Sequence, residues 1–360
     1  MPRRLCLFTL LIATSLAAQR PTTPAGARRL LGGLADDSMQ GRATGTPGAQ
    51  RAARMIAAEM KRIGLEPLGD SGYFQRVPVS GDSSLLPQRH RVRDPRDSTK
   101  FSIVVDSARM LWSDALQLRT SFADLDSVPL ARRRPAVNVV GVLRGSDPQL
   151  RNEVVLIDAH YDHLGMRRPA EGADSIYNGA DDDASGVTAV LEIARQMAEG
   201  PKPRRTVLFA ATIGEERGLL GTRWFIDHPP IPLEQMVANL EIEMIGRPDS
   251  LAGGAGKAWL TGYERSTMGD ALAANGIPIV PDRRPAQGFF ERSDNIAFAR
   301  KGIVAHTLSS FNLHTDYHQL SDDVSKVDFA HMAGVINAAA KASRLLADGP
   351  RPEWKPGGRP

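Results

Sequence analysis

Histidines and carboxylates gather in five short clusters along the 360-residue chain. The clusters are AHYDHLG from Ala159, NGADDDASG from Asn178, GEE from Gly214, NLEIEM from Asn239 and HTDYHQLSDD from His314. Imidazole and carboxylate are common ligands of first-row transition metals, and one carboxylate can bridge two cations. Two adjacent glutamates, Glu215 and Glu216, can divide the work, because one ligates a metal while the other moves protons. The clusters therefore indicate a metal site in which a shared carboxylate permits two ions.

Each cluster also has a plain structural interpretation when it is taken alone. Three consecutive aspartates, Asp181 to Asp183, are suited to cap a helix, because carboxylates are stabilised at a helix N-terminus. His314 and His318 are equally suited to a surface loop. The sequence contains no HExxH, GxSxG or P-loop pattern, so the common single-motif explanations for an enzyme are missing. The combination of clusters, rather than any one of them, favours metal chemistry.

The clusters follow apolar runs that are typical of buried strands. These runs cover residues 136–142, 154–157, 206–212, 240–244 and 303–308. Amphipathic patterns over residues 184–199 and 328–347, and another that stops at Gly64, predict helices. Strands that alternate with helices predict an α/β fold whose sheet is covered on both faces. In such folds ligands bind beyond the carboxyl ends of the strands, so we expect the clusters to converge there.

The first residues of the chain predict a targeting segment. Arg3 and Arg4 precede an apolar run over residues 5–16, and small residues follow, which is the pattern of a signal peptide over residues 1–18. Cleavage of that segment would remove Cys6, the single cysteine of the chain. The pattern predicts a secreted or periplasmic protein.

The remaining sequence predicts one folded domain over residues 19–348. Residues 77–135 are polar, so we expect loops and short strands there. Residues 349–360 are rich in Pro and Gly and predict a flexible tail. The net charge of +4 is too small for a nucleic-acid partner, which requires clustered basic residues. No later run is apolar enough to predict a membrane span.

Taken in order, the clusters resemble the secreted di-zinc aminopeptidases, the family that includes bacterial leucyl aminopeptidase and vacuolar aminopeptidase Y. The matching segments are GRATGTPG at Gly41, AHYDHLG, NGADDDASG, GEERGLLG, NLEIEMIGR, ERSDNIAFARKGI at Glu291 and YHQLSDD at Tyr317. The resemblance implies the zinc exopeptidase, phosphorylase/hydrolase-like fold, with a mixed, mostly parallel central sheet and helices on both faces. The stretch between Gly64 and His160 is too short for the protease-associated insert that some relatives carry.

The resemblance also implies two zinc ions per chain. His160 and Glu243 would hold one ion. Glu216 and His318 would hold the other, and Asp182 would bridge both. Family members often have aspartate at the position of Glu243, and the longer glutamate side chain still permits ligation.

The same resemblance implies the catalytic and supporting groups. Glu215 would be the general base, which takes a proton from a metal-bridging water and returns it to the departing amine, so that no covalent intermediate is needed. Asp162 would orient His160, and Asp183 would orient neighbouring groups. The peptide bond between Asp182 and Asp183 would be cis.

Further residues near the motifs have supporting roles in this interpretation. The residues expected near the substrate pocket are Phe289, Phe290, Ser293 and Asp294. The histidines expected to be structural or to support ligands are His163, His306 and His314. Glu241 shares a strand face with Glu243 and is the second choice for that ligand position.

The resemblance predicts an aminopeptidase that removes unblocked N-terminal residues from peptides or proteins. Three alternatives remain open: a zinc carboxypeptidase, a glutaminyl cyclase on the same fold, and a binding domain that has lost its metals. Cyclases of this type keep one zinc ion and lack the NGADDDASG pattern. A binding domain is disfavoured because residues able to ligate or to act as the base fill all of these positions.

Overall fold

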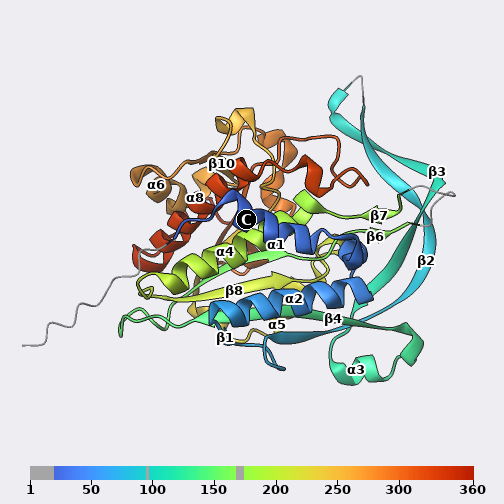
Figure 1. Ribbon diagram of the computed structural model, residues 1–360, viewed down its shortest axis with the longest axis horizontal. Coiled ribbons are helices and arrows are strands. Elements are labelled where there is room, and N and C mark those ends of the chain that lie inside the picture. The colour runs from blue at the N-terminus through green and yellow to red at the C-terminus, as the bar shows by residue number, and fades with distance from the viewer. Residues whose placement is uncertain (1–19, 95–96, 168–173) are drawn as a thin grey trace, which may run out of the picture.

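The computed structural model describes residues 20–94, 97–167 and 174–360, with side chains described outside residues 82–114. The predicted signal peptide over residues 1–18 lies outside the described residues. Figure 1 shows a large twisted sheet with helices packed on it. The predicted α/β fold with helices on both faces of a mixed sheet is confirmed.

Four parallel strands form the centre of a ten-stranded sheet. In spatial order they are β12 (Val304–Ser309), β9 (Met236–Ile242), β5 (Val154–His160) and β8 (Thr206–Thr212). Every residue of these strands is buried. Strands covered on both faces are rich in apolar side chains, which explains the apolar runs of the sequence.

Shorter or antiparallel strands extend the sheet on either side. Beyond β8 lie β4 (Arg133–Leu143), β2 (Phe74–Asp94) and β3 (Asp97–Leu118), and β1 (Glu66–Pro67) also pairs with β4. Beyond β12 lie β10 (Ala258–Leu260) and β11 (Ile279–Pro281). A separate small hairpin joins β6 (Gly165–Met166) to β7 (Ile176–Tyr177). The parallel strands are therefore confined to the middle of the sheet and to the β10–β11 pair.

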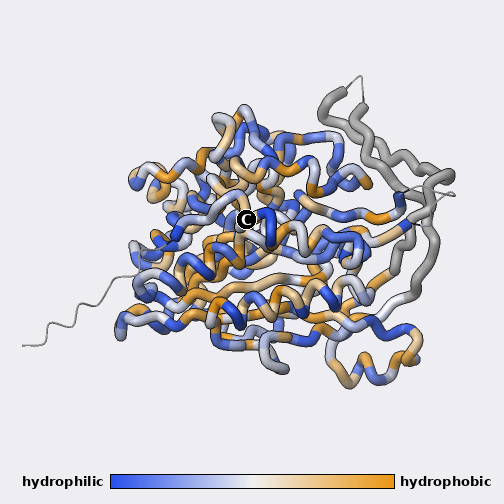
Figure 2. The backbone as a smooth tube through the Cα atoms, in the orientation of Figure 1, coloured by the Kyte–Doolittle hydropathy of each residue, from blue (hydrophilic) through white to orange (hydrophobic). Residues whose placement is uncertain are grey.

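Helices cover both faces of the sheet. One face carries α1 (Pro24–Leu34), α2 (Pro47–Ile63), α4 (Gly186–Glu199) and α8 (Phe329–Asp348). The opposite face carries α5 (Leu220–Asp227) and α7 (Asn295–Arg300). Figure 2 shows hydrophobic segments concentrated in the interior between these layers. In the described residues no helix is both long and apolar enough to cross a membrane.

The boundaries of α2 follow from local sequence signals. The Thr46 side chain accepts a hydrogen bond from the Ala49 N–H, and Pro47 occupies the first turn, where its missing N–H costs nothing. Gly64 ends the helix with a φ of 89°, a left-handed conformation that glycine adopts without strain. This end was predicted from the sequence.

Two regions differ from the sequence-based expectations. Residues 77–135 do not form only loops and short strands, because β2 and β3 are antiparallel strands of 21 and 22 residues. The C-terminal segment expected to be flexible packs on the domain instead. Its Trp354 forms a bridge with Ser266, and the Trp354 indole donates a hydrogen bond to the Gly302 carbonyl. The polar composition of residues 77–135 gave no sign that β2 and β3 pair. The C-terminal segment is held by contacts with residues far away in the sequence.

Candidate metal centre

The carboxyl ends of the central strands bring the five clusters together. His160 is the last residue of β5, and Glu243 directly follows β9. Glu215 and Glu216 lie in the short helix η4 (Glu215–Arg217) after β8. Asp182 lies in the turn η3 (Ala180–Ser185) that leads into α4.

The fifth cluster arrives from the other end of the chain. His318 lies in the loop after β12 and has a φ of 56°. All five clusters thus supply side chains to one edge of the sheet, as the convergence at strand ends requires.

One group of potential metal ligands consists of His160, Asp182 and Glu243. The Nε2 atom of His160 lies 3.3 Å from Oδ1 of Asp182. The other ring nitrogen, Nδ1, lies 3.1 Å from the carbonyl oxygen of Asp162 and 3.7 Å from its Oδ1 atom. An imidazole held in this way through Nδ1 is oriented so that Nε2 can bind a metal ion.

A second group shares the Asp182 carboxylate. It consists of His163, Asp182 and Glu216, and His163 Nδ1 lies 2.8 Å from Glu216 Oε1. His318 faces the same oxygens: its Nε2 atom lies 3.1 Å from Asp182 Oδ2 and 3.3 Å from Glu216 Oε2. The structure therefore brings together all the residues that the sequence suggested as ligands, and it adds His163.

The donor atoms have the properties expected of metal ligands. Several buried atoms make no well-directed hydrogen bond within the described part of the chain, although some approach a carboxylate closely, as His163 Nδ1 approaches Glu216 Oε1. They include His160 Nε2, Glu216 Oε1 and both ring nitrogens of His163. Unpaired buried polar atoms are rare in folded proteins and call for a partner. Imidazoles and carboxylates together suit zinc. The residues present therefore fit metal binding at both groups.

Charge and desolvation shape the proton affinities of the glutamates. Desolvation raises the pKa of Glu215 well above its ordinary value, and the neighbouring charges of Glu216 and Glu243 raise it further against the opposing effect of His160. Desolvation likewise raises the pKa of Glu243, to about 7. Desolvation would also raise the pKa of Glu216, but His318 and His163 outweigh it and lower the pKa. The pKa values of the two adjacent glutamates are thus shifted in opposite directions, which suits Glu215 to carry a proton and Glu216 to ligate a metal.

The strand register separates Glu243 from Glu241. Strand β9 ends at Ile242, two residues earlier than the apolar run suggested, so Glu243 lies beyond the sheet. Glu241 stays inside it, where its carboxylate accepts hydrogen bonds from the hydroxyls of Ser293 and Thr307. Its oxygens also accept from the backbone N–H groups of Asp294 and Asn295. Glu241 is fully occupied within the core and is absent from both ligand groups.

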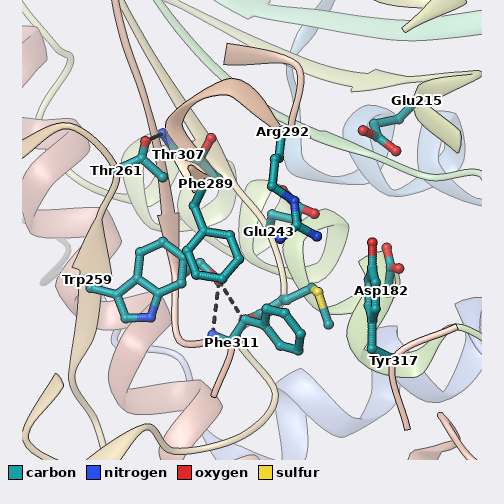
Figure 3. Close-up of a pocket in the computed structure, with 12 residues that line it drawn as sticks. Asp182, Glu215, Glu243, Trp259, Thr261, Phe289, Arg292, Thr307, Phe311 and Tyr317 are labelled. Carbon is teal, nitrogen blue, oxygen red and sulfur yellow. Dashed lines mark hydrogen bonds between the residues drawn. The ribbon is translucent and has the colours of Figure 1, made fainter. Parts of the chain in front are cut away.

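A pocket opens beside the metal-binding residues. Figure 3 shows Phe289 between Trp259 and Arg292, with Glu243 and Asp182 along the same cavity. Trp259 and Phe289 are stacked with ring centroids 5.1 Å apart, and Phe311 meets Phe289 edge-on at 6.0 Å. One end of this pocket is apolar and the other carries the carboxylates.

The four residues expected near the pocket have different positions. Phe289 lines it, whereas Phe290 packs against His306 and Trp354 in a separate part of the core. Ser293 and Asp294 are buried beneath the site rather than in the pocket wall, and Asp294 Oδ2 accepts a hydrogen bond from Thr212.

The supporting residues of the centre lie close to the predicted positions. Asp162 lies beside His160, and its Oδ1 atom accepts a hydrogen bond from the Glu215 N–H. Asp183 accepts hydrogen bonds from the N–H groups of Gly186 and Met244, and the Asp182–Asp183 bond is cis, as expected.

The other histidines have structural contacts. His314 Nε2 lies 2.9 Å from Asp181 Oδ2, and His306 lies between the Ser266 hydroxyl and the Thr261 carbonyl. Sequence reasoning missed the pocket residues Trp259, Arg292, Phe311 and Tyr317. Tyr317 adjoins a predicted ligand, which was an available signal, whereas nothing local marks Trp259.

The fold and the paired ligand groups define a metal-dependent hydrolase built on an α/β sheet. The chain belongs to peptidase family M28, whose model matches residues 138–343, more than half of the chain. This family assignment confirms the resemblance found in the sequence and makes the chain a hydrolase of a zinc-dependent family.

Individual relatives agree with this assignment. A vacuolar membrane protease from Lachancea thermotolerans is 26% identical over 218 residues, which cover 58% of this chain and 20% of that protein. A zinc aminopeptidase from Bacillus subtilis has the same fold with a TM-score of 0.62 at 16% identity, covering 91% of this chain and 96% of the other. A glutaminyl cyclase from Porphyromonas gingivalis has a TM-score of 0.52 at 14% sequence identity, covering 89% of this chain and 97% of the other. At such identities the solved structures support the fold alone.

The curated relatives correct the expected localisation. Four of them are named vacuolar membrane proteases, which contradicts the prediction of a secreted or periplasmic protein. The chain spans about a fifth to a quarter of the length of these relatives. Residues 1–18, on which that prediction depended, lie outside the described residues.

Proposed function

We propose that this chain is a two-zinc aminopeptidase that hydrolyses the first peptide bond of peptides with a free N-terminus. The observation that carries the proposal is that two ligand groups share the Asp182 carboxylate next to an apolar pocket. His160 and Glu243 would hold one ion. Glu216 with His318, and with His163 beside them, would hold the other.

The chain's own residues have distinct tasks in this reaction. Zinc, when bound, supplies a Lewis acid that polarises the scissile carbonyl and lowers the pKa of water. Glu215 accepts the proton of the attacking water and delivers it to the departing amine. Desolvation raises its pKa well above that of an exposed glutamate, which makes it a stronger base toward the attacking water. Asp162 holds both His160 and the Glu215 backbone in place.

The pocket supports a preference for large apolar N-terminal side chains. Trp259, Phe289 and Phe311 provide flat apolar walls, which bury an apolar side chain favourably. Glu215 and Glu243 line the other end, so a substrate whose first side chain fills the apolar part would have its first peptide bond beside the proposed base and metal site.

A zinc carboxypeptidase is the second candidate because of Arg292. This residue lines the same pocket, and its guanidinium lies 5.0 Å from the centre of the Phe289 ring. Arginine binds carboxylates through paired hydrogen bonds, so Arg292 is suited to a free C-terminus. The solved structures of this fold that are named aminopeptidases favour the aminopeptidase.

Blocked peptides distinguish these reactions directly. The zinc-loaded protein would be incubated with Phe-Ala-Ala, with its N-acetyl form and with its C-terminal amide, and the products identified by mass spectrometry. An aminopeptidase releases Phe from the free and amidated peptides and leaves the acetylated one intact. Cleavage of the acetylated peptide with loss of activity on the amide would establish the carboxypeptidase instead.

Two further results would overturn the enzyme class. Loss of ammonia from a peptide that begins with Gln, without cleavage of a peptide bond, would identify a glutaminyl cyclase. A protein that binds no zinc and leaves all of these peptides intact would be a binding domain. The matched control is the same protein stripped of metal with a chelator, in which activity should be lost and then restored by zinc.

A further inference from the structure

Arg42 is a charged side chain in the interior with an unusual set of partners. Its exposed fraction is 0%, and it is among the largest fully buried side chains. It forms no ion pair with a carboxylate in the described part of the chain, and all of its hydrogen bonds go to backbone carbonyls. Burying an arginine is costly, so its donors must be satisfied by fixed acceptors.

Those acceptors tie three segments of the chain to one guanidinium. Nη1 donates to the carbonyls of Leu34 at 2.8 Å and Asn178 at 2.6 Å. Nε donates to the Tyr161 carbonyl at 2.8 Å, and Nη2 donates to the Gly179 carbonyl at 2.9 Å. One planar side chain therefore fixes the distances between α1 and two loops of the metal centre.

The two loops carry ligands of both metal groups. Tyr161 directly follows His160, and Gly179 begins the turn that contains Asp182. The Nε2 atom of His160 lies 3.3 Å from Oδ1 of Asp182. Arg42 therefore contacts the backbone one residue after His160 and three residues before Asp182.

The local backbone explains how this side chain comes to point inward. The segment η1 (Asp37–Arg42) lies beside β6 and β7 (Figure 1). Gln40, Gly41 and Arg42 have φ values of 52°, 63° and 52°, all left-handed. A Cβ atom on Gly41 would lie 2.3 Å from the Gly165 carbonyl oxygen, so only glycine permits this close packing.

A neighbouring contact extends the same support to the base. The hydroxyl of Thr44 donates to Asp162 Oδ2 at 2.8 Å, and Asp162 Oδ1 accepts from the Glu215 N–H at 3.2 Å. Arg42 thus contacts the backbone of both ligand loops, and Thr44, two residues later, contacts Asp162 in one of them.

The charge of Arg42 also suits its position. Burial lowers the pKa of the guanidinium, and the carboxylates of Asp182, Asp322 and Asp162 oppose that shift. Arginine keeps its charge in proteins. A fixed cation behind crowded carboxylates reduces their mutual repulsion, which is largest before a metal binds.

We propose that Arg42 is a positioning residue that holds His160 and Asp182 at the separation needed for tight zinc binding. The inference rests on the proposed zinc site and goes beyond it, because Arg42 touches neither the metals nor the substrate. It acts through the backbone of the two ligand loops, and Thr44 supports the base in the same way through Asp162.

Zinc affinity tests this role with a matched control. Arg42→Lys keeps the charge but loses the planar fork, and Arg42→Met loses both. Arg205 is also buried and donates to the Leu346 and Gly349 carbonyls and to the Glu153 carboxylate, but it precedes β8, at the opposite end of the strands from the metal centre. Arg205→Met therefore measures the loss of a buried arginine without an effect on the ligand loops.

The expected result is a loss of zinc affinity of about 10- to 100-fold in both Arg42 variants, the range typical of residues that orient metal ligands. Affinity would be measured by competition with a chelator, and the zinc-induced rise in melting temperature by thermal unfolding. Arg205→Met should lower the melting temperature with and without zinc by similar amounts and leave the zinc affinity unchanged.

Each outcome decides between the two proposals. Wild-type affinity and a wild-type zinc-induced shift in Arg42→Lys would overturn the role of Arg42 and leave the zinc site standing. Absence of zinc binding in the wild-type protein would instead overturn the proposed function. If neither Arg42 variant folds, Arg42→Gln replaces them, since its planar amide keeps two N–H donors but cannot reach all four carbonyls. Weaker zinc binding in that variant supports the positioning role, and unchanged binding contradicts it.

Discussion

The Oδ1 atom of Asp162 accepts a hydrogen bond of 3.2 Å from the backbone N–H of Glu215. Asp162 also contacts His160 Nδ1 through its carbonyl oxygen. Asp162, two residues beyond the end of β5, therefore contacts both the proposed ligand His160 and the backbone of the proposed base Glu215. The two proposed roles would be coupled through Asp162.

Asp162→Asn tests that coupling. We expect zinc affinity and kcat to fall together by about 10- to 100-fold. The amide cannot accept from both the Thr44 hydroxyl and the Glu215 N–H, so the loop whose Asp162 carbonyl holds His160 would shift. Chelator competition and steady-state kinetics at saturating zinc measure the two effects. A variant with normal affinity and normal turnover would show that Asp162 only fills space.

Glu215→Gln separates catalysis from metal binding. The amide cannot carry a proton, so we expect turnover to fall by about 10²- to 10⁴-fold or more, with zinc content unchanged. Metal analysis and peptide hydrolysis would be performed on the same preparation. Activity within tenfold of the parent would exclude Glu215 as the base.

The second ligand group can be dissected by zinc stoichiometry. Asp182→Ala should lower the affinity for both zinc ions, because this carboxylate belongs to both ligand groups. In His318→Ala and in His163→Ala, only the affinity for the ion held by Glu216 should fall. The expected loss is at least about tenfold, because loss of a residue that merely supports a metal ligand already costs that much. Metal analysis after dialysis against a weak chelator gives the number of ions retained. Unchanged zinc binding in His163→Ala would show that His318, and not His163, is the histidine ligand beside Glu216.

Two adjacent phenylalanines provide a matched pair for substrate selectivity. Phe289→Ala opens the pocket, so kcat/KM for peptides that begin with Phe should fall relative to peptides that begin with Ala. One or two lost apolar contacts are worth about 1–3 kcal/mol, or roughly 10- to 200-fold in selectivity. Phe290→Ala should reduce stability without changing this ratio, because Phe290 lies in the core. A similar change in selectivity in both variants would contradict the pocket assignment.

His306 predicts a loss of stability in mild acid. Burial lowers its pKa to about 4, and its two ring nitrogens are already committed to Ser266 and the Thr261 carbonyl. The unfolded chain, with an imidazole pKa of about 6.5, then binds more protons than the folded chain between pH 6.5 and 4. The free energy of unfolding should therefore fall as the pH drops through this range, by about 3 kcal/mol from this group.

Urea unfolding of the metal-free protein measures this effect. In His306→Gln the titrating group is gone, so the fall between pH 7 and pH 4 should be smaller by about that amount. Equal pH dependence in the two proteins would mean that His306 accepts a proton in the folded state.

Local signals made parts of the fold predictable. The apolar runs marked every central strand, and Gly64 marked the end of α2, because burial and helix termination depend on neighbouring residues. The start of β9 was missed. Asn239 interrupts its apolar pattern, and it is tolerated because its amide donates to Asp158 at 2.6 Å on the adjacent strand. A partner eighty residues away in the sequence cannot be seen locally.

The site was predictable in composition but not in geometry. The clusters and the resemblance together supplied the ligands from His160 to His318, whereas the contacts of His163 and Arg42 depend on packing between distant segments. Nothing in GRATGTPG shows that the backbone at residues 40–42 is left-handed and turns Arg42 inward. Phe289 and Phe290 are chemically identical, and only the fold places one in the pocket and the other in the core.

The position of His318 after β12 has a consequence for the order of events during synthesis. His160, Asp182 and Glu243 all lie before it in the chain, and β12 must pair with β9 before its following loop can reach Asp182. Parallel pairing of this kind closes a long loop and forms late, because the entropy of closure must be overcome first. A nascent chain that has not yet produced residue 318 therefore lacks the imidazole that lies beside Asp182 and Glu216 in the second ligand group. Binding of the full complement of metal would then occur only after β12 has joined the sheet. The enzyme would therefore stay inactive until the central sheet is complete.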